Sequence, residues 1–334
     1  MILRHYKKGE GILKLVSIVV PMYNEAPVID NYFRTMREVL GDASAKKGVR
    51  FEIIAVNDGS GDGTLDKLRQ WQKEINCLSV LSLSRNFGQE PAVFAGLERA
   101  RGDAAIVMDC DLQDPPEMIL PMIEKWEKGY DVVNCRRVSR KSDTRFKRDT
   151  AGLYYAILNK LSHKVKYPHN VNNFRLVSRR VLDLILAMPE KQKFYRGLVA
   201  YCGFKSYDLE IERKQRAEGE SKYNFKAMVR LAVDGIASTS TKPLSWALGF
   251  GIFFLGLGAL SSIALLVLYL LGIGLNYTLF GILSGLSFFT GILLVFLGIV
   301  GIYLGKAFEE IKGRPFAIEE AFYPAKERQE GESR

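Results

Sequence analysis

Residues 104–117 read AAIVMDCDLQDPPE, an apolar run followed at once by two carboxylates and then by two prolines. The run Ala104–Met108 predicts a buried strand, and the prolines favour the start of a helix. Asp109 and Asp111, at the end of such a strand, offer the oxygen ligands that Mg²⁺ or Mn²⁺ binds. An acidic turn after a strand is also common without any ligand, so both interpretations stay open on this motif alone.

The same alternation of apolar runs with helical patterns extends through the first half of the chain. Further strands are predicted at Leu15–Val20, Phe51–Val56, Leu78–Leu83 and Asp131–Cys135. Apolar residues recur at helical spacing in Ala26–Leu40, Thr64–Ile75, Gln89–Ala100 and Pro116–Lys128. Strands that alternate with helices of this length predict an α/β fold with a mainly parallel sheet. In such sheets ligands bind beyond the carboxyl ends of the strands.

The loops that follow these predicted strands are rich in polar residues. Residues 57–60 read NDGS. Asp58 can accept hydrogen bonds from a nucleobase or a ribose, and Gly59 permits a close approach of the backbone. An ordinary Asx turn that caps the next helix explains the same residues equally well. Glu25, which lies shortly after Pro21 and Tyr23, is either an acid in the first turn of a helix or a contact for a nucleotide.

A long uncharged stretch separates the polar first part of the chain from its end. From Pro243 to Gly305 there is no Asp, Glu, Lys, Arg or His. Because a helix crosses a bilayer with about 20 apolar residues, the stretch predicts two spans, within Leu244–Ile273 and Leu279–Leu304. Lysines and arginines flank only the outer ends of this hairpin, which predicts that both termini are cytoplasmic. A buried core hairpin of a soluble protein is the alternative.

These patterns divide the chain into four parts. Residues 1–220 form the predicted cytoplasmic catalytic domain, residues 221–242 an amphipathic juxtamembrane segment, residues 243–305 the transmembrane hairpin and residues 306–334 a cytoplasmic tail. The tail from Glu319 onward is polar, and we expect it to be frayed. The whole pattern predicts a two-span protein of the inner, cytoplasmic membrane.

The net charge of +10 suits either nucleic acid or an anionic membrane surface. The sequence contains no recognisable nucleic-acid-binding module, and the predicted spans favour the membrane. Residues 136–149 are strongly basic. This segment is either a solvated face attracted to anionic lipid or a clamp for a phosphate group. Four cysteines without paired spacing predict reduced thiols and no zinc site.

Several motifs together carry a resemblance to a known family. They are SIVVPMYNE at 17–25, NDGS at 57–60, SRNFG at 84–88, DCDLQDPPE at 109–117 and FRL at 174–176. With this combination the chain resembles the family 2 glycosyltransferases of the GT-A fold. Within that family it is similar to the polyprenyl-phosphate glycosyltransferases of the GtrB type, which are related to dolichol-phosphate mannose synthase. The resemblance covers nearly the whole chain, including the two-span carboxyl end.

The resemblance implies a reaction and an assembly. A sugar, by likeness glucose from UDP-glucose, would be transferred to a polyprenyl phosphate such as undecaprenyl phosphate. We expect a metal-dependent single displacement that inverts the anomeric carbon, with Mg²⁺ or Mn²⁺ as the cofactor. The resemblance also implies a homo-oligomer, a tetramer.

The resemblance assigns roles to single residues as well. The residues that would line the nucleoside pocket or lie beside the donor are Pro21, Tyr23, Glu25, Asp58 and Asp109. Asp111 would ligate the metal at the diphosphate, with Asp109 as the second candidate ligand, and Gln113 would lie near the reacting sugar. The residues that would bind the lipid phosphate are Arg136, Arg145, Lys147 and Arg148.

One position departs from the GtrB-type pattern. Where that pattern has Gly-Asp-Phe-Arg-Leu, this chain reads NNFRL at 172–176. The family's Asp has been assigned as a catalytic base or as a ligand of a sugar hydroxyl. Asn173 keeps the shape and a carbonyl group but cannot take up a proton. Either the change impairs catalysis, or the base is dispensable because a phosphate monoester, with a second pKa of about 6, is already mostly a dianion at neutral pH.

Two other functions stay open. A processive polysaccharide synthase of the same superfamily would carry a Gln-x-x-Arg-Trp motif and more spans, and this chain has neither. A membrane-tethered, non-catalytic binder of nucleotide-sugars would fit Asn173 as a sign of lost catalysis. Nucleotide binding without turnover would distinguish that binder from an enzyme.

Overall fold

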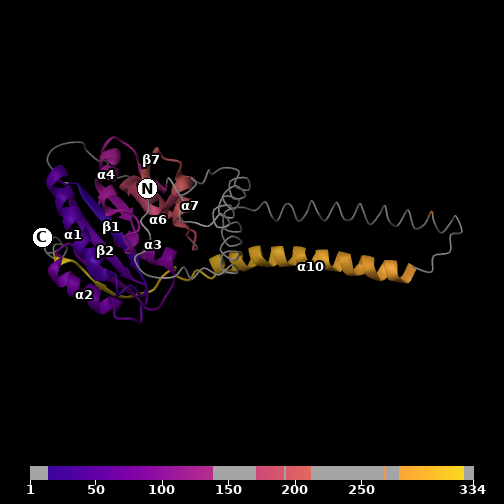
Figure 1. The fold of residues 1–334 in the computed structure, drawn as a ribbon. Helices are drawn as coiled ribbons and strands as arrows, with labels where there is room; N and C mark the ends of the chain where they lie inside the picture. The colour runs from indigo at the N-terminus through magenta and orange to yellow at the C-terminus, as the bar shows by residue number, and fades with distance from the viewer. Residues whose placement is uncertain (1–13, 138–170, 192, 212–266, 268–277, 327–334) are drawn as a thin grey trace. The chain divides into compact units, whose positions relative to one another are not determined.

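The computed structural model describes residues 14–137, 171–191, 193–211, 267 and 278–326 (Figure 1). These residues belong to two compact units. One unit contains a β-sheet with its covering helices, and the other contains the helix α10 (Thr278–Ile311).

The first unit is built on an eight-stranded sheet in the order β7-β5-β6-β4-β1-β2-β3-β8. The strands are β1 (Leu15–Met22), β2 (Arg50–Asn57), β3 (Leu78–Leu83), β4 (Ala104–Val107), β5 (Val132–Arg137), β6 (Val171–Ser178), β7 (Ser206–Ile211) and β8 (Glu319–Tyr323). The four central strands β1 to β4 are parallel to one another, and β7 is parallel to β5. Only β6 and β8 are antiparallel to their neighbours among the described strands. The predicted α/β fold with a mainly parallel sheet is confirmed.

Helices cover both faces of this sheet. One face carries α1 (Ile29–Lys47), α2 (Thr64–Glu74), η1 (Pro116–Met118) and α4 (Ile119–Glu127). The other face carries α3 (Gln89–Arg99), α6 (Arg179–Ala187) and α7 (Tyr195–Cys202). Successive strand side chains point to opposite faces, so Ile18 belongs to the first core and Val19 to the second. The central strands β1 to β4 are therefore covered by helices on both faces.

The end of the chain contradicts one prediction. The segment from Glu319, predicted to be frayed, forms β8 and pairs with the open edge of β3. The Nε of Arg99 donates to Glu319 Oε1 at 3.0 Å, and Ser82 Oγ donates to Glu320 Oε2 at 3.2 Å. The prediction was wrong because two glutamates that look solvated in the sequence have partners on α3 and β3.

The helix α10 is 34 residues long and contains the second predicted span, Leu279–Leu304. Among the described residues, no helix combines the length and the apolar character that crossing a membrane requires. The first predicted span and the amphipathic segment 221–242 lie outside the described residues, apart from residue 267. The predicted hairpin therefore stays a prediction.

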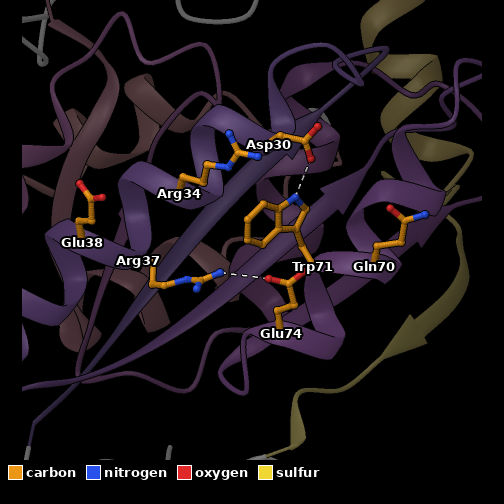
Figure 2. Close-up of a pocket in the computed structure, with 7 residues that line it drawn as sticks. All are labelled: Asp30, Arg34, Arg37, Glu38, Gln70, Trp71 and Glu74. Carbon is orange, nitrogen blue, oxygen red and sulfur yellow. Dashed lines mark hydrogen bonds and ion pairs between the residues drawn. The ribbon is translucent and has the colours of Figure 1, made fainter.

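A polar cavity of about 480 Å³ lies between α1 and α2 (Figure 2). Its charged groups bind one another: Trp71 Nε1 donates to Asp30 at 2.9 Å, and Arg37 pairs with Glu74 at 3.1 Å. The hydrogen bonds from Lys67 and Trp71 hold the pKa of Asp30 below its ordinary value. None of the residues predicted for the functional site lines this cavity.

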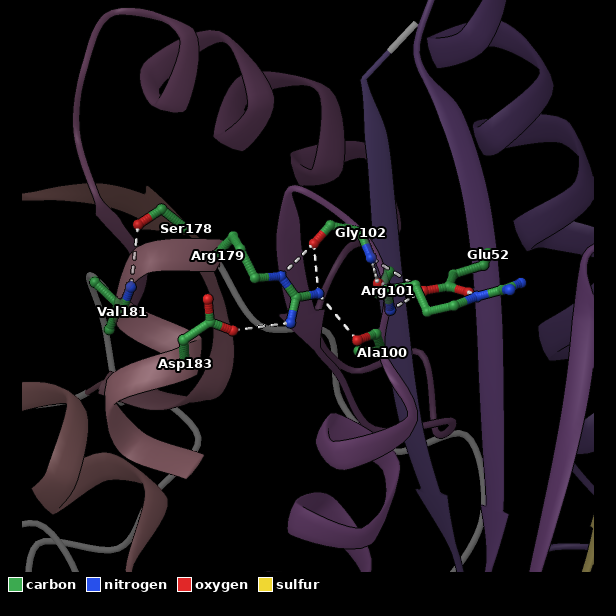
Figure 3. A network of polar contacts seen from close by, with 9 residues as sticks. Glu52, Ala100, Arg101, Gly102, Ser178, Arg179, Val181 and Asp183 are labelled. Carbon is green, nitrogen blue, oxygen red and sulfur yellow. Dashed lines mark hydrogen bonds and ion pairs between the residues drawn. The ribbon is translucent and has the colours of Figure 1, made fainter. Parts of the chain in front are cut away.

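A network of polar contacts braces the amino-terminal side of β4 (Figure 3). The buried Oε1 of Glu52 accepts hydrogen bonds from Ser17 Oγ at 2.6 Å, from Arg101 N at 2.6 Å and from Gly102 N at 3.2 Å. Arg179, at the start of α6, donates from Nε to the carbonyl of Gly102 at 2.8 Å. One carboxylate and one guanidinium thus join β1, β2, the turn before β4 and α6. These contacts lie at the opposite end of β4 from the loop that carries the predicted site.

We predict that Glu52→Leu lowers the free energy of unfolding by about 3 kcal/mol, because it leaves several buried donors without an acceptor. Urea unfolding of the full chain, followed by intrinsic fluorescence, measures the change. Glu74→Leu is the matched control, since its exposed ion pair with Arg37 contributes less than about 1 kcal/mol. Equal effects of the two substitutions would contradict the bracing role of Glu52.

Candidate functional site

The loops after β1, β2, β3 and β4 open at one edge of the sheet because these four strands are parallel. The register places Met22 of β1 opposite Asn57 of β2, and Val19 opposite Val107 of β4. The polar residues that the sequence predicts to act together, from Tyr23 to Asp111, therefore follow strand ends that lie side by side.

The loops after β1 and β2 form one hydrogen-bonded structure. Asn24 has a left-handed backbone, with φ of 55°. Its N–H donates to Ser60 Oγ at 3.0 Å, and its Oδ1 accepts from Gly61 N at 2.9 Å. Glu25 N donates to Thr64 Oγ1 at 3.0 Å. These bonds fix the backbone directly after Tyr23, whose side chain is exposed.

Asp58 holds the loop that follows β3. Its carboxylate is only 3% exposed and accepts hydrogen bonds from the backbone N–H of Phe87 at 2.7 Å and of Gly88 at 2.9 Å. Burial raises the pKa of this carboxyl group above its ordinary value, although the two N–H donors and Arg85 oppose the shift. Asp58 does not cap the next helix, because Asp62 is the side chain that accepts from Thr64 N, at 3.1 Å. The predicted contact of Asp58 with a nucleoside stays a prediction.

Gly59 is required by the same contact between loops. Its φ of 62° lies in the left-handed region, and a methyl group there would overlap the backbone of Arg85. The close approach that the sequence suggested is therefore an approach of the β2 loop to the β3 loop. It brings the carboxylate of Asp58 within reach of the N–H groups that it binds.

Three acids in the loops after β1 and β4 influence one buried thiol. Cys110 is buried, and its pKa is raised well above the ordinary thiol value, first by burial and then by the negative charges of Glu25, Asp109 and Asp111. Asp111 Oδ1 accepts from Gln113 N at 3.1 Å, in a turn where Leu112 has a φ of 53°. Glu25 and the Asp-x-Asp motif thus follow neighbouring parallel strands that end at this edge, and the shared site stays a prediction.

The antiparallel strand β6 brings a second group of residues to this edge. Val107 of β4, two residues before Asp109, pairs with Arg175 of β6, two residues after Asn173. Asn173 is 5% exposed and Arg175 is 1% exposed. The guanidinium of Arg175 lies 5.5 Å from the ring centre of Tyr195. Gln113, predicted near the reacting sugar, is buried.

Two residues of this edge were missed by the sequence analysis. Gln89 Nε2 donates to Asp109 Oδ1 at 2.9 Å, and its neighbour Glu90 accepts from Tyr195 N at 2.8 Å. Both lie in the first turn of α3, directly after the SRNFG motif. Their position after a strand-end loop was a signal, but their partners lie on distant parts of the chain.

The residues predicted to bind an acceptor phosphate are only partly described. Arg136, near the end of β5, is partly exposed, and its guanidinium pairs with Glu210 of β7 at 2.8 Å. Arg145, Lys147 and Arg148 lie outside the described residues.

Comparisons with known proteins agree on one family. The model of glycosyl transferase family 2 matches residues 17–186. The chain is 40% identical to YkcC, an uncharacterized glycosyltransferase of Bacillus subtilis, over 92% of this chain and 94% of that protein. It is 38% identical to the SfII prophage-derived bactoprenol glucosyl transferase of Shigella flexneri, over 90% of this chain and 96% of that protein. The crystal structure of mannosyl-3-phosphoglycerate synthase from Rubrobacter xylanophilus matches with a TM-score of 0.46 and 16% identity, over 70% of this chain and 74% of that one.

We predict that Gly59→Ala lowers the free energy of unfolding by about 2 kcal/mol, because a left-handed backbone disfavours a side chain and the added methyl overlaps Arg85. Gly61→Ala is the matched control, since a methyl group at that glycine meets no atom within 4 Å. Urea unfolding of the two full-length variants measures the difference. A loss at Gly59 no larger than that at Gly61 would show that the two loops are not in close contact.

Proposed function

Because this chain belongs to glycosyl transferase family 2, we propose that it transfers a sugar, glucose from UDP-glucose, to a polyprenyl phosphate such as undecaprenyl phosphate at the cytoplasmic face of a membrane. The observation that supports the proposal best is that Glu25, Asp58 and the Asp-x-Asp motif follow parallel strands that end at one edge of the sheet, where such folds bind ligands. The relatives named bactoprenol glucosyl transferases, 38% identical over 90% of the chain, support a polyprenyl acceptor.

The proposed reaction is one in-line displacement. An oxygen of the acceptor phosphate forms a bond to the anomeric carbon of the sugar while the bond from that carbon to the diphosphate oxygen breaks. The bonding electrons leave with UDP, and the anomeric carbon is inverted. The protein's part is to hold nucleophile and donor in line, which can lower the barrier by several kcal/mol, and to surround the departing diphosphate with fixed hydrogen-bond donors and charges.

Asn173 does not exclude this reaction. The nucleophile is a phosphate monoester whose second pKa is about 6, so near neutral pH it carries its attacking charge without giving up a proton to the protein. An amide at position 173 can still orient a substrate hydroxyl group. The competing proposal, a binder of nucleotide-sugars without turnover, rests on the same residue and predicts a different result in the assay below.

The side chains at this edge fit a hard divalent cation. Asp109 and Asp111 offer carboxylate oxygens, and Mg²⁺ is commonly bound by one or two carboxylates together with substrate phosphates. Within the described residues, no three His, Cys, Asp or Glu side chains are grouped as a metal site. We propose that Asp111, with Asp109, would hold Mg²⁺ or Mn²⁺ against the diphosphate of the donor. When bound, such an ion neutralises charge on the leaving nucleotide.

Membrane attachment is part of the proposal. It is supported by the absence of charged residues from Pro243 to Gly305. Many large apolar side chains of α10 are also exposed, among them Leu286, Leu293 and Leu304, and exposed apolar surface of this kind marks contact with lipid or with another protein. The basic segment 136–149 would then attract the anionic headgroup of the acceptor. The homotetramer likewise stays a prediction.

The central experiment offers the purified full chain a panel of nucleotide-sugars with polyprenyl phosphate and Mg²⁺ or Mn²⁺. We expect sugar from UDP-glucose to appear in the organic phase, and a chelator of divalent cations to stop its formation. Binding of UDP-glucose without any lipid-linked sugar would favour the non-catalytic binder.

We predict that Asp111→Asn lowers kcat for lipid-linked sugar by about 100-fold or more, because the carboxylate that would hold the divalent cation against the leaving diphosphate is lost. Asp42→Asn is the matched control, since Asp42 is an exposed aspartate of α1. Both variants should unfold at the same urea concentration as the parent protein. Undiminished turnover in Asp111→Asn would refute the proposed role of this carboxylate.

A further inference from the structure

Glu90 is a carboxylate at the functional edge for which the proposed reaction has no use. It lies in the first turn of α3, where the helix dipole favours negative charge. Its Oε2 accepts from Tyr195 N of α7 at 2.8 Å, and its carboxylate also hydrogen-bonds to the side chain of Asn173 on β6. Burial raises the pKa of Glu90 above its ordinary value, opposed by the Tyr195 N–H, by the charges of Arg196 and Arg175, and by Asn173.

The contact with Glu90 decides how the amide of Asn173 is turned. An ionised carboxylate only accepts hydrogen bonds, whereas an amide has one donating end and one accepting end. The NH₂ group of Asn173 must therefore face Glu90, and its carbonyl must face away. In agreement, Asn173 Oδ1 is buried and accepts no hydrogen bond from any residue that the structure describes.

Asn173 lies on β6, at the same edge of the sheet as the loop that follows β4. The sheet order β6-β4-β1-β2 places β4 and β1 between Asn173 and the Asp58 loop after β2, which is predicted to contact the nucleoside. Gln89, the neighbour of Glu90, donates to Asp109 at 2.9 Å and so ties α3 to the Asp-x-Asp motif. Phosphate oxygens cannot donate to a carbonyl, so the donor-substrate groups that suit Asn173 Oδ1 on this side are hydroxyls of the sugar.

We propose that Glu90 is a positioning residue that holds the amide of Asn173 with its carbonyl turned toward a hydroxyl group of the donor sugar. The inference rests on the proposed function, because only a nucleotide-sugar donor brings such a hydroxyl to this edge. The carbonyl of Asn173 then accepts the hydrogen bond from the sugar hydroxyl. The negative charge of Glu90 keeps the amide of Asn173 from rotating by about 180°.

Glu90→Gln tests the proposal at nearly constant shape. In this variant the amide oxygen at position 90 still accepts from the N–H of Tyr195, so the NH₂ group at position 90 faces Asn173. This NH₂ group favours the orientation of Asn173 in which its carbonyl, and not its own NH₂ group, faces position 90. We expect affinity for UDP-glucose to fall about tenfold, the equivalent of one lost hydrogen bond, while affinity for UDP itself stays within about twofold. Glu98→Gln is the matched control, since Glu98 is exposed on the same helix.

Exchanging the two side chain types supplies the decisive variant. Glu90→Gln combined with Asn173→Asp lets an amide on α3 donate to a carboxylate on β6, whose second oxygen again faces the sugar. We expect the ratio of the UDP-glucose and UDP dissociation constants to return to within about threefold of the parent value. A structural role of Glu90 alone would not be rescued by a change at Asn173.

Isothermal titration calorimetry measures the dissociation constants of UDP and UDP-glucose for each full-length variant. Thermal unfolding checks that each variant is folded. An unchanged ratio in Glu90→Gln overturns the positioning role, as does an exchanged protein that fails to fold or to recover the ratio. If Glu90→Gln alone does not fold, the exchanged protein decides in the same way. A parent chain that binds no nucleotide-sugar would instead refute the proposed function, and a parent chain that is active with an unchanged ratio in Glu90→Gln refutes only this inference.

Discussion

The parallel pairing of β1 with β2 and with β4 brings negative charge together at one end of the sheet. Strands that run in one direction release their loops at one edge, so the loops that carry Glu25, Asp109 and Asp111 open on the same side of the sheet. The charges of these three acids help to raise the pKa of the buried Cys110 thiol. In the proposed reaction, a bound divalent cation would offset part of this negative charge.

The buried carboxylates of this domain serve two different purposes. Glu52, on β2, lies near the amino-terminal end of β4. Its Oε1 accepts three hydrogen bonds from the protein. Asp58 and Glu90 lie at the other end, and each accepts backbone N–H groups from a loop or helix that is distant in the chain. A buried charge is tolerated when its hydrogen bonds are satisfied. At the edge that carries the candidate site, the same requirement ties loops and helices together.

Local patterns predicted the central strands and their helices because each of these elements buries a periodic apolar face. Leu78–Leu83 was predicted at the bounds observed for β3. β6 was missed because its sequence, VNNFRLVS, contains two asparagines and a buried arginine. These polar residues are tolerated only through pairing on both sides, and β8 was misread as frayed because the partners of Glu319 and Glu320 lie more than 200 residues earlier.

For the candidate site, too, the sequence predicted the local motifs but not the contacts between distant parts of the chain. Its strand-end acids follow apolar runs, so the sequence identified Asp58, Asp109 and Asp111 as members of one edge. It did not show that the carboxylate of Asp58 is bound by two N–H groups of the β3 loop. Glu90 was missed because its partner Tyr195 lies 105 residues away. Contacts of this range depend on the completed sheet and leave no local pattern.

The meaning of Asn173 changes once Glu90 is placed beside it. An aspartate at this position would put two carboxyl groups in contact, and one of them would keep a proton that weakens its use as a base. An asparagine removes the like charge and leaves a carbonyl whose direction is set by the remaining carboxylate. A reaction whose nucleophile is already a phosphate dianion loses no proton acceptor that it needs. In the proposed reaction the amide is therefore compatible with catalysis, since the task of this position would be to orient the sugar.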